Sequence, residues 1–89
     1  MSDVPDAPRE RFEYFSNEYA QALQAYQTIE TRAATLLLMG HHEELRQFIA
    51  QFLEMATRMR DLALAHHEAN FADWFGELVT KAEALAGTV

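Results

Sequence analysis

Two copies of the triplet His-His-Glu contain the residue types in this chain that could bind a metal ion. The first copy occupies residues 41–43, and the second begins 25 residues later, at residues 66–68. Imidazole nitrogens and carboxylate oxygens are common ligands of zinc and iron. The triplets are therefore the first candidates for a chemical site.

The spacing of these residues does not fit a metal site within one chain. The sequence contains no Glu-x-x-His, the motif of di-iron helical bundles, and only His41 and Glu44 are spaced three apart. Along one helix, residues 41 and 66 would lie roughly 38 Å apart. An antiparallel dimer could bring the triplets of two copies together. A metal-binding or metal-responsive bundle using His41, His42, His66 and His67 is therefore kept as the alternative hypothesis.

The same triplets are also typical of helix ends. Glutamate favours the positive end of the helix dipole, and histidine tolerates a partly hydrated negative end. We therefore expect the triplets to mark the first and last turns of one helix. A pH-responsive interface is a further alternative, because histidine titrates near neutral pH.

Other signals of catalysis are absent from the sequence. There are no cysteines, which excludes a disulfide scaffold, a thiolate zinc site and a cysteine nucleophile. Ser16 has no histidine at helical spacing to activate it, and there is no glycine-rich phosphate loop. We expect no enzymatic activity and no cofactor.

Charge and hydropathy limit the partners of the chain. Seven Lys and Arg against 14 Asp and Glu give a net charge of −7. Nucleic acids and anionic lipids bind cationic surfaces, so neither is an expected partner. The longest apolar run, residues 36–39, is too short to cross a bilayer. Without a signal-peptide pattern or cysteines, we expect a cytoplasmic protein, and the arginine and alanine content suggests a bacterial genome.

Helix-breaking residues divide the chain into a short tail and one helical domain. Both prolines, Pro5 and Pro8, precede residue 9, and the composition is 49% hydrophobic. We expect residues 1–8 to be a flexible acidic tail and residues 9–89 to be a single all-α domain.

Two long helices are predicted from heptad spacing, at about residues 9–39 and 42–68. The apolar seam of the first helix comprises Phe12, Phe15, Tyr19, Ala22, Tyr26, Ile29, Ala33 and Leu36. The core-facing series of the second helix comprises Leu45, Phe48, Phe52, Met55, Met59, Leu62 and His66, with a flanking row of Ile49, Ala56 and Ala63. A face this broad indicates contact with more than one helix.

The two apolar series are out of phase at Gly40. A glycine in the left-handed conformation would cap the first helix and form an αα-hairpin. The alternative is one continuous helix, in which an interior glycine costs only about 1 kcal/mol. We favour the hairpin.

A shorter third helix is predicted at about residues 70–86. Asn70 and Asp73 resemble a capping box at its start, and Gly87 follows its end. Trp74 and Phe75 point about 100° apart on a helix. One of them is therefore expected to face the hairpin and the other to lie nearer its edge.

The predicted helix lengths expose the hairpin end. A third helix about 24 Å long would cover only the aromatic part of a first helix roughly 45 Å long. The residues expected to remain uncovered, and to form an oligomer or partner interface, are Leu36, Leu37, Leu38, Met39, Leu45, Phe48 and Ile49. We expect a second copy to bind there, completing a helical bundle by two-fold dimerisation or in a higher oligomer. A helix from another protein is the alternative partner.

Overall fold

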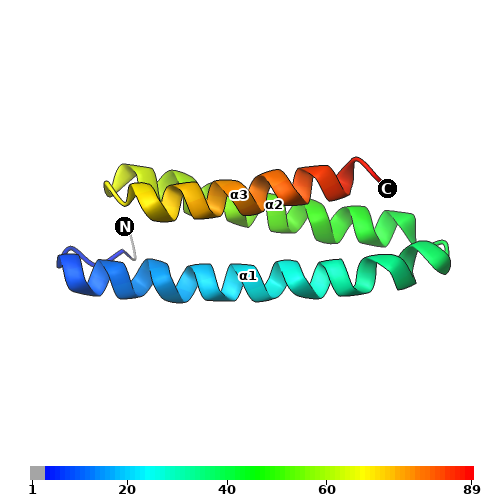
Figure 1. Ribbon diagram of the computed structural model, residues 1–89, viewed down its shortest axis with the longest axis horizontal. Helices are drawn as coiled ribbons and strands as arrows, with labels where there is room; N and C mark the ends of the chain where they lie inside the picture. Colours follow the sequence, from blue (N-terminus) through cyan, green and yellow to red (C-terminus); the bar gives the residue numbers. More distant parts are fainter. Residues whose placement is uncertain (1–3) are drawn as a thin grey trace.

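Three helices form the fold, as the sequence predicts (Figure 1). The computed structural model describes residues 4–89, so the first three residues of the predicted tail lie outside the described residues. Helix α1 spans Pro8–Leu38, α2 spans His42–Ala65 and α3 spans Ala69–Ala86. The all-α class and the order of one long hairpin followed by a shorter helix are confirmed.

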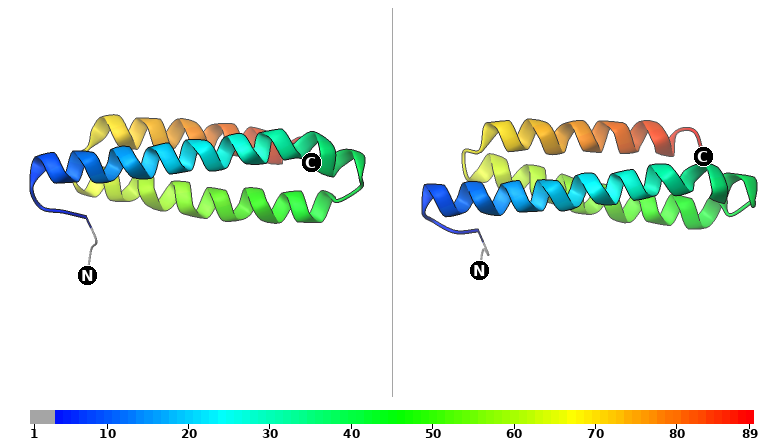
Figure 2. Two further views of the ribbon diagram at one scale, coloured as in Figure 1. Left: turned by 90° about the horizontal axis from the view of Figure 1, so that it is seen from below. Right: turned by 60° about the horizontal axis from the view of Figure 1, so that its bottom comes forward.

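Consecutive helices run antiparallel in an elongated bundle (Figures 1 and 2). The bundle measures 47 × 22 × 17 Å, and its radius of gyration is 14.4 Å. A more spherical domain of this length would have a radius of gyration of about 12 Å. Helices α2 and α3 pack closely on each other, whereas α1 contacts both less extensively. Helix α1 therefore has flanks on which further surface can be buried.

The turn at Gly40 decides between hairpin and continuous helix. Gly40 has a φ of 77°. Its N–H donates to the carbonyl of Leu37 at 3.2 Å, and the N–H of His41 donates to Leu36 at 2.8 Å. These two bonds define a Schellman motif, which satisfies the last carbonyls of α1 and reverses the chain. The hairpin is confirmed, and a continuous rod is wrong.

The turn between α2 and α3 repeats this geometry without a glycine. His67 has a φ of 60°, and its N–H donates to Leu64 at 3.1 Å. The N–H of Glu68 donates to Ala63 at 2.8 Å. Helix α2 therefore ends at Ala65, three residues before the predicted end, because the Schellman bonds stop the helix while the apolar spacing continues.

The predicted capping box at Asn70 is wrong. Helix α3 begins at Ala69, its N-cap is Glu68, and no side chain caps it. The Glu68 carbonyl accepts a bond from the Ala72 N–H at 3.0 Å. The carboxylate of Glu68 instead accepts the Nε–H of Arg11 at 3.0 Å, which ties the start of α1 to this turn.

The core runs the length of the bundle. Its largest fully buried side chains are Phe15, Leu45, Ile49, Phe75 and Leu78. Val4 is also buried, at 6% exposure, although the prediction assigned it to a flexible tail. The chain before α1 turns back at the helix start (Figure 2), and Arg11 donates to the Asp6 carbonyl at 3.4 Å. This turn brings an apolar side chain of the tail into contact with the core.

Candidate interaction surface

Two of the seven predicted interface residues are buried within their own chain. Leu45 is 0% exposed and Ile49 is 1% exposed, so the expectation that they stay uncovered is wrong. Helix α2 has 24 residues and α3 has 18, a smaller mismatch than the sequence predicted. The residues after α3 extend its cover, since Arg46 near the start of α2 donates to the carbonyl of Val89 at 3.3 Å.

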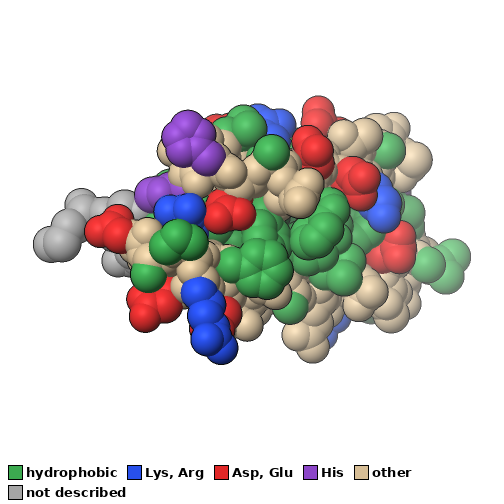
Figure 3. All heavy atoms as spheres, turned by 60° about the vertical axis from the view of Figure 1, so that its left-hand side comes forward, with side chains coloured by type: hydrophobic (Ala, Val, Ile, Leu, Met, Phe, Trp, Pro, Cys, Tyr) green, Lys and Arg blue, Asp and Glu red, His purple; other side chains and the backbone are tan. Residues whose placement is uncertain are grey.

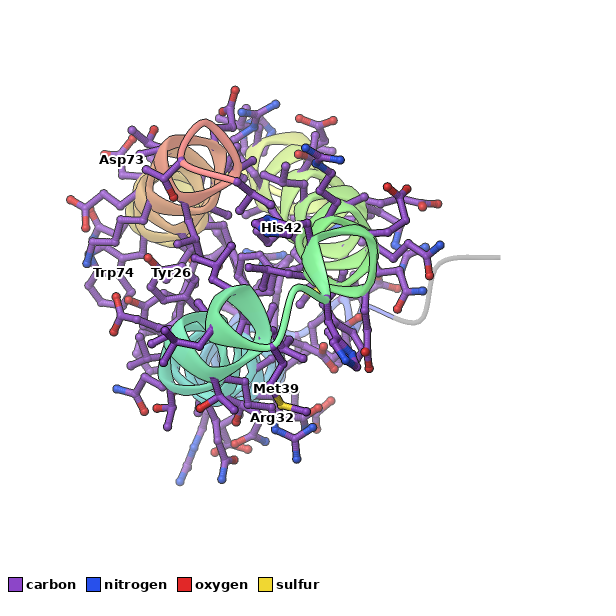
Figure 4. The ribbon with its side chains drawn as sticks, turned by 90° about the vertical axis from the view of Figure 1, so that its right-hand side faces the viewer. Tyr26, Arg32, Met39, His42, Asp73 and Trp74 are labelled. Carbon is purple, nitrogen blue, oxygen red and sulfur yellow. The ribbon has the colours of Figure 1, made fainter. Side chains whose placement is uncertain are left out.

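The other five predicted residues keep exposed surface at the hairpin end. Leu38 is 89% exposed and Met39 is 62% exposed, whereas the other three are half-buried. We call these five residues the hairpin-end surface: Leu36, Leu37, Leu38, Met39 and Phe48. Figure 4 shows Met39 beside Arg32, on the side of α1 that faces away from α3. The hairpin end is thus apolar but only partly uncovered.

A shallow groove continues from this surface between α1 and α2. A small cavity of ≈ 70 Å³ lies next to the hairpin end, and a more open hollow of ≈ 350 Å³ adjoins it. No residue of α3 lines either one. We call this groove the open seam and define it by the apolar lining residues that keep exposed surface: Ala25, Ile29, Leu36, Phe48 and Met55.

The flank between α1 and α3 is filled by aromatic rings. We call it the aromatic seam, and its residues are Phe12, Tyr19, Phe71, Trp74 and Phe75. The Phe12 and Phe71 ring centroids are 5.3 Å apart, and Tyr19 lies 5.5 Å from Trp74. Figure 3 shows hydrophobic side chains gathered along this face. Although Phe12 and Trp74 are partly exposed, both rings already have partners in their own chain.

The structure resolves which of two neighbouring aromatic residues faces the hairpin. Phe75 is 0% exposed, and Trp74 is 43% exposed at the edge of the bundle. Figure 4, which looks along the helices, shows Trp74 at the outer edge of the space between α1 and α3. The sequence indicated that one of the two must face inward, but the choice depends on how α3 is rotated about its own axis.

The His-His-Glu triplets mark helix boundaries, as predicted. His41 is the N-cap of α2 and His66 is its C-cap, although the second triplet lies in the turn rather than in the last helical turn. The Nδ1 atom of His41 lies 3.2 Å from a carboxylate oxygen of Glu44. Within residues 4–89, no group of three or more histidine and acidic side chains is arranged to hold a metal ion.

The pKa of the Tyr26 phenol is clearly shifted. Burial raises the pKa of its phenol above the ordinary value of 10.0, and the charge and hydrogen bond of Glu30 raise it further. The Tyr26 ring packs 5.7 Å from the ring of Phe52. At neutral pH the phenol is therefore protonated, and it acts as a packing group between α1 and α2.

Comparisons with protein-family models, curated proteins and solved structures give no match for this chain. None of the helices in residues 4–89 is long and apolar enough to cross a membrane. The hairpin-end surface and the open seam are therefore interpreted from the structure of this chain alone.

Proposed function

We propose that the chain is a non-catalytic protein-interaction module that associates with itself through the hairpin end. The observation that carries this proposal is the exposure of Leu38 and Met39, at 89% and 62%. Figure 4 shows Met39 beside Arg32, which lines the cavity at the hairpin end of the open seam, so the apolar surface of the tip continues into this groove. Burying such a surface stabilises a complex by roughly 25 cal/mol for each Å² of apolar area removed from water.

A second copy is the partner that this surface suits best. An isologous interface uses the same patch on both copies, so two α1–α2 hairpins can close into a four-helix arrangement. The aromatic seam is a weaker candidate, because its exposed rings already contact rings of the same chain. A helix from another protein is the alternative occupant of the groove.

Light scattering on the purified protein at tens of micromolar tests self-association. We expect a mass of at least twice the 10.2 kDa of one chain. The double variant Leu38→Glu/Met39→Glu should be monomeric with an unchanged helical spectrum, because both side chains are exposed. The control Leu64→Glu changes a leucine that is 57% exposed near the other end of α2, and it should retain the oligomer. A monomeric wild-type protein would remove the proposal.

A further inference from the structure

We propose that the second copy docks along the open seam with its hairpin end beside that of the first. The two-fold axis would run parallel to the helices, so that α1 of each copy covers α2 of the other. This inference rests on the proposed function, since it requires a homodimer. It assigns the contacts of that dimer from the pattern of charge along the seam.

A row of residues on α1 runs beside the seam. Glu18, Ala25, Arg32 and Met39 follow one another at intervals of seven, which places them on one side of the helix. Ala25 and Arg32 line the seam hollows, and Figure 4 shows Arg32 and Met39 pointing to the same side. The row therefore presents a negative charge, a small apolar side chain, a positive charge and an exposed apolar side chain.

A matching row on α2 has the charges in the reverse order relative to the hairpin end. Glu44, Gln51 and Arg58 are also spaced by seven, and Gln51 lines the same hollow as Ala25. Because α1 and α2 are antiparallel, Arg32 and Glu44 are both about 10.5 Å along the helix axes from the level of Ala25 and Gln51, on the side toward the hairpin end. Glu18 and Arg58 lie at the same distance on the other side.

Most of the charged side chains in these two rows have no ion-pair partner within one chain. Neither Glu18, Arg32 nor Arg58 makes an ion pair in the part of the chain from residue 4 to residue 89. Glu44 contacts His41 through one carboxylate oxygen. Glu18 is half-buried beside the seam.

Docking with the hairpin ends together pairs every charge of these rows. Since α1 then lies over α2 of the other copy, Arg32 faces Glu44 and Glu18 faces Arg58. The two-fold axis repeats each contact, giving four ion pairs around an apolar centre. Charge pairs at the rim of an interface contribute chiefly to specificity and orientation, while the apolar seam contributes the affinity.

The opposite orientation, with the hairpin ends apart, also pairs unlike charges, but it places Met39 beside a charged side chain of the other copy. With the hairpin ends apart, α1 lies over α1 of the other copy and Glu18 faces Arg32. Met39, 14 residues beyond Ala25, would then lie level with Arg11, whose guanidinium is bound to Glu68. With the hairpin ends together, the two apolar tips are adjacent. The exposed methionine therefore favours the first orientation.

Charge reversal distinguishes the orientations. Arg32→Glu and Glu44→Arg alone should each weaken dimerisation at least about tenfold, because each creates two like-charge contacts per dimer. An equimolar mixture of the two variants should restore the wild-type dissociation constant, since every contact in the mixed dimer then joins a carboxylate and a guanidinium. Analytical ultracentrifugation of each variant and of the mixture measures this. The melting temperature of each variant checks that both exposed substitutions leave the fold intact.

The outcomes separate this inference from the proposed function. A wild-type dimer whose single variants associate normally would overturn the docking along the seam and leave self-association standing. Weakened variants without rescue in the mixture would overturn the orientation, because opposed hairpin ends place the carboxylate introduced by Arg32→Glu against Glu18. A wild-type monomer would refute both proposals. A second mixture, Glu18→Arg with Arg58→Glu, should show the same rescue if the inference is correct.

Discussion

The two flanks of α1 differ in what fills them. On one flank, the aromatic seam, rings from α1 and α3 interlock at centroid distances of 5.3–5.6 Å. On the other flank, the open seam, half-buried side chains of α1 and α2 border hollows that no third helix covers. Both flanks are apolar in sequence. The comparison teaches that hydrophobic spacing identifies surfaces to be buried, whereas the path of α3 decides which one is buried within the chain.

The largest expected effect is a loss of folding stability when a ring of the aromatic seam is removed, whereas removal of a ring of the open seam should mainly weaken association. Phe71→Ala in the aromatic seam should lower the free energy of unfolding by about 3–5 kcal/mol, because Phe71 is 2% exposed and contacts three other rings. Phe48→Ala in the open seam should cost the single chain less, since Phe48 is only half-buried, but it should weaken the dimer. Urea unfolding at low concentration and sedimentation measure the two effects. Equal destabilisation by both variants would break the distinction between the seams.

A second, smaller effect concerns the turn that aligns the open seam. Gly40→Ala should lower the free energy of unfolding by about 1–2 kcal/mol, because an L residue is strained at a φ of 77°. An added Cβ would meet no atom within 4 Å, so the cost is one of backbone conformation. Gly87→Ala is the matched control, since its φ is −67° and it should change stability little. Thermal unfolding of both variants measures the difference.

The left-handed residue in the turn between α2 and α3 should show a change in the free energy of unfolding of the opposite sign. His67 occupies the same left-handed position at a φ of 60°. His67→Gly relieves that strain and should raise the free energy of unfolding by roughly 0.5–1 kcal/mol. The control is His66→Gly, at a φ of −103°, where added flexibility should lower stability. A loss of stability in His67→Gly would show that the imidazole makes a contact worth more than the strain it imposes.

Much of this architecture follows from local sequence signals, and the remainder depends on contacts between distant residues. The heptad spacing and Gly40 predict α1, α2 and the hairpin, because helix periodicity and a left-handed cap are local properties. The predicted end of α2 is three residues late, since apolar spacing continues through His66 and no glycine or proline marks the turn. A histidine in the left-handed position is a weak local signal.

The cover of the hairpin end could not be predicted from helix lengths alone. The prediction of seven uncovered residues assumes a longer α2 and no contribution from residues 87–89. In the structure α2 is shorter, and the Arg46–Val89 bond holds the C-terminal residues near its start. That bond joins residues 43 positions apart. Leu45 and Ile49 are therefore buried, while Leu38 and Met39 remain exposed, as expected from their place at the tip.

The smallest effect is expected at Tyr26, a buried ring of α1 that packs against α2. Because its folded-state pKa is raised above 10.0, the neutral phenol is the form that the fold stabilises. This contribution is fully present below pH 10 and is lost as the pH rises through the folded-state pKa. The free energy of unfolding should therefore decline above about pH 10.

Tyr26→Phe isolates the contribution of this phenol. The variant keeps the ring against Phe52, whose centroid is 5.7 Å away, but it has no proton to lose. Its unfolding free energy should fall less between about pH 9 and pH 11 than that of the wild type. Tyr19→Phe is the matched control for loss of a phenol, since the Tyr19 ring lies in the aromatic seam against Trp74 and Phe75. An identical alkaline profile for Tyr26→Phe and the wild type would mean that the Tyr26 phenol is open to water and that its burial does not raise its pKa.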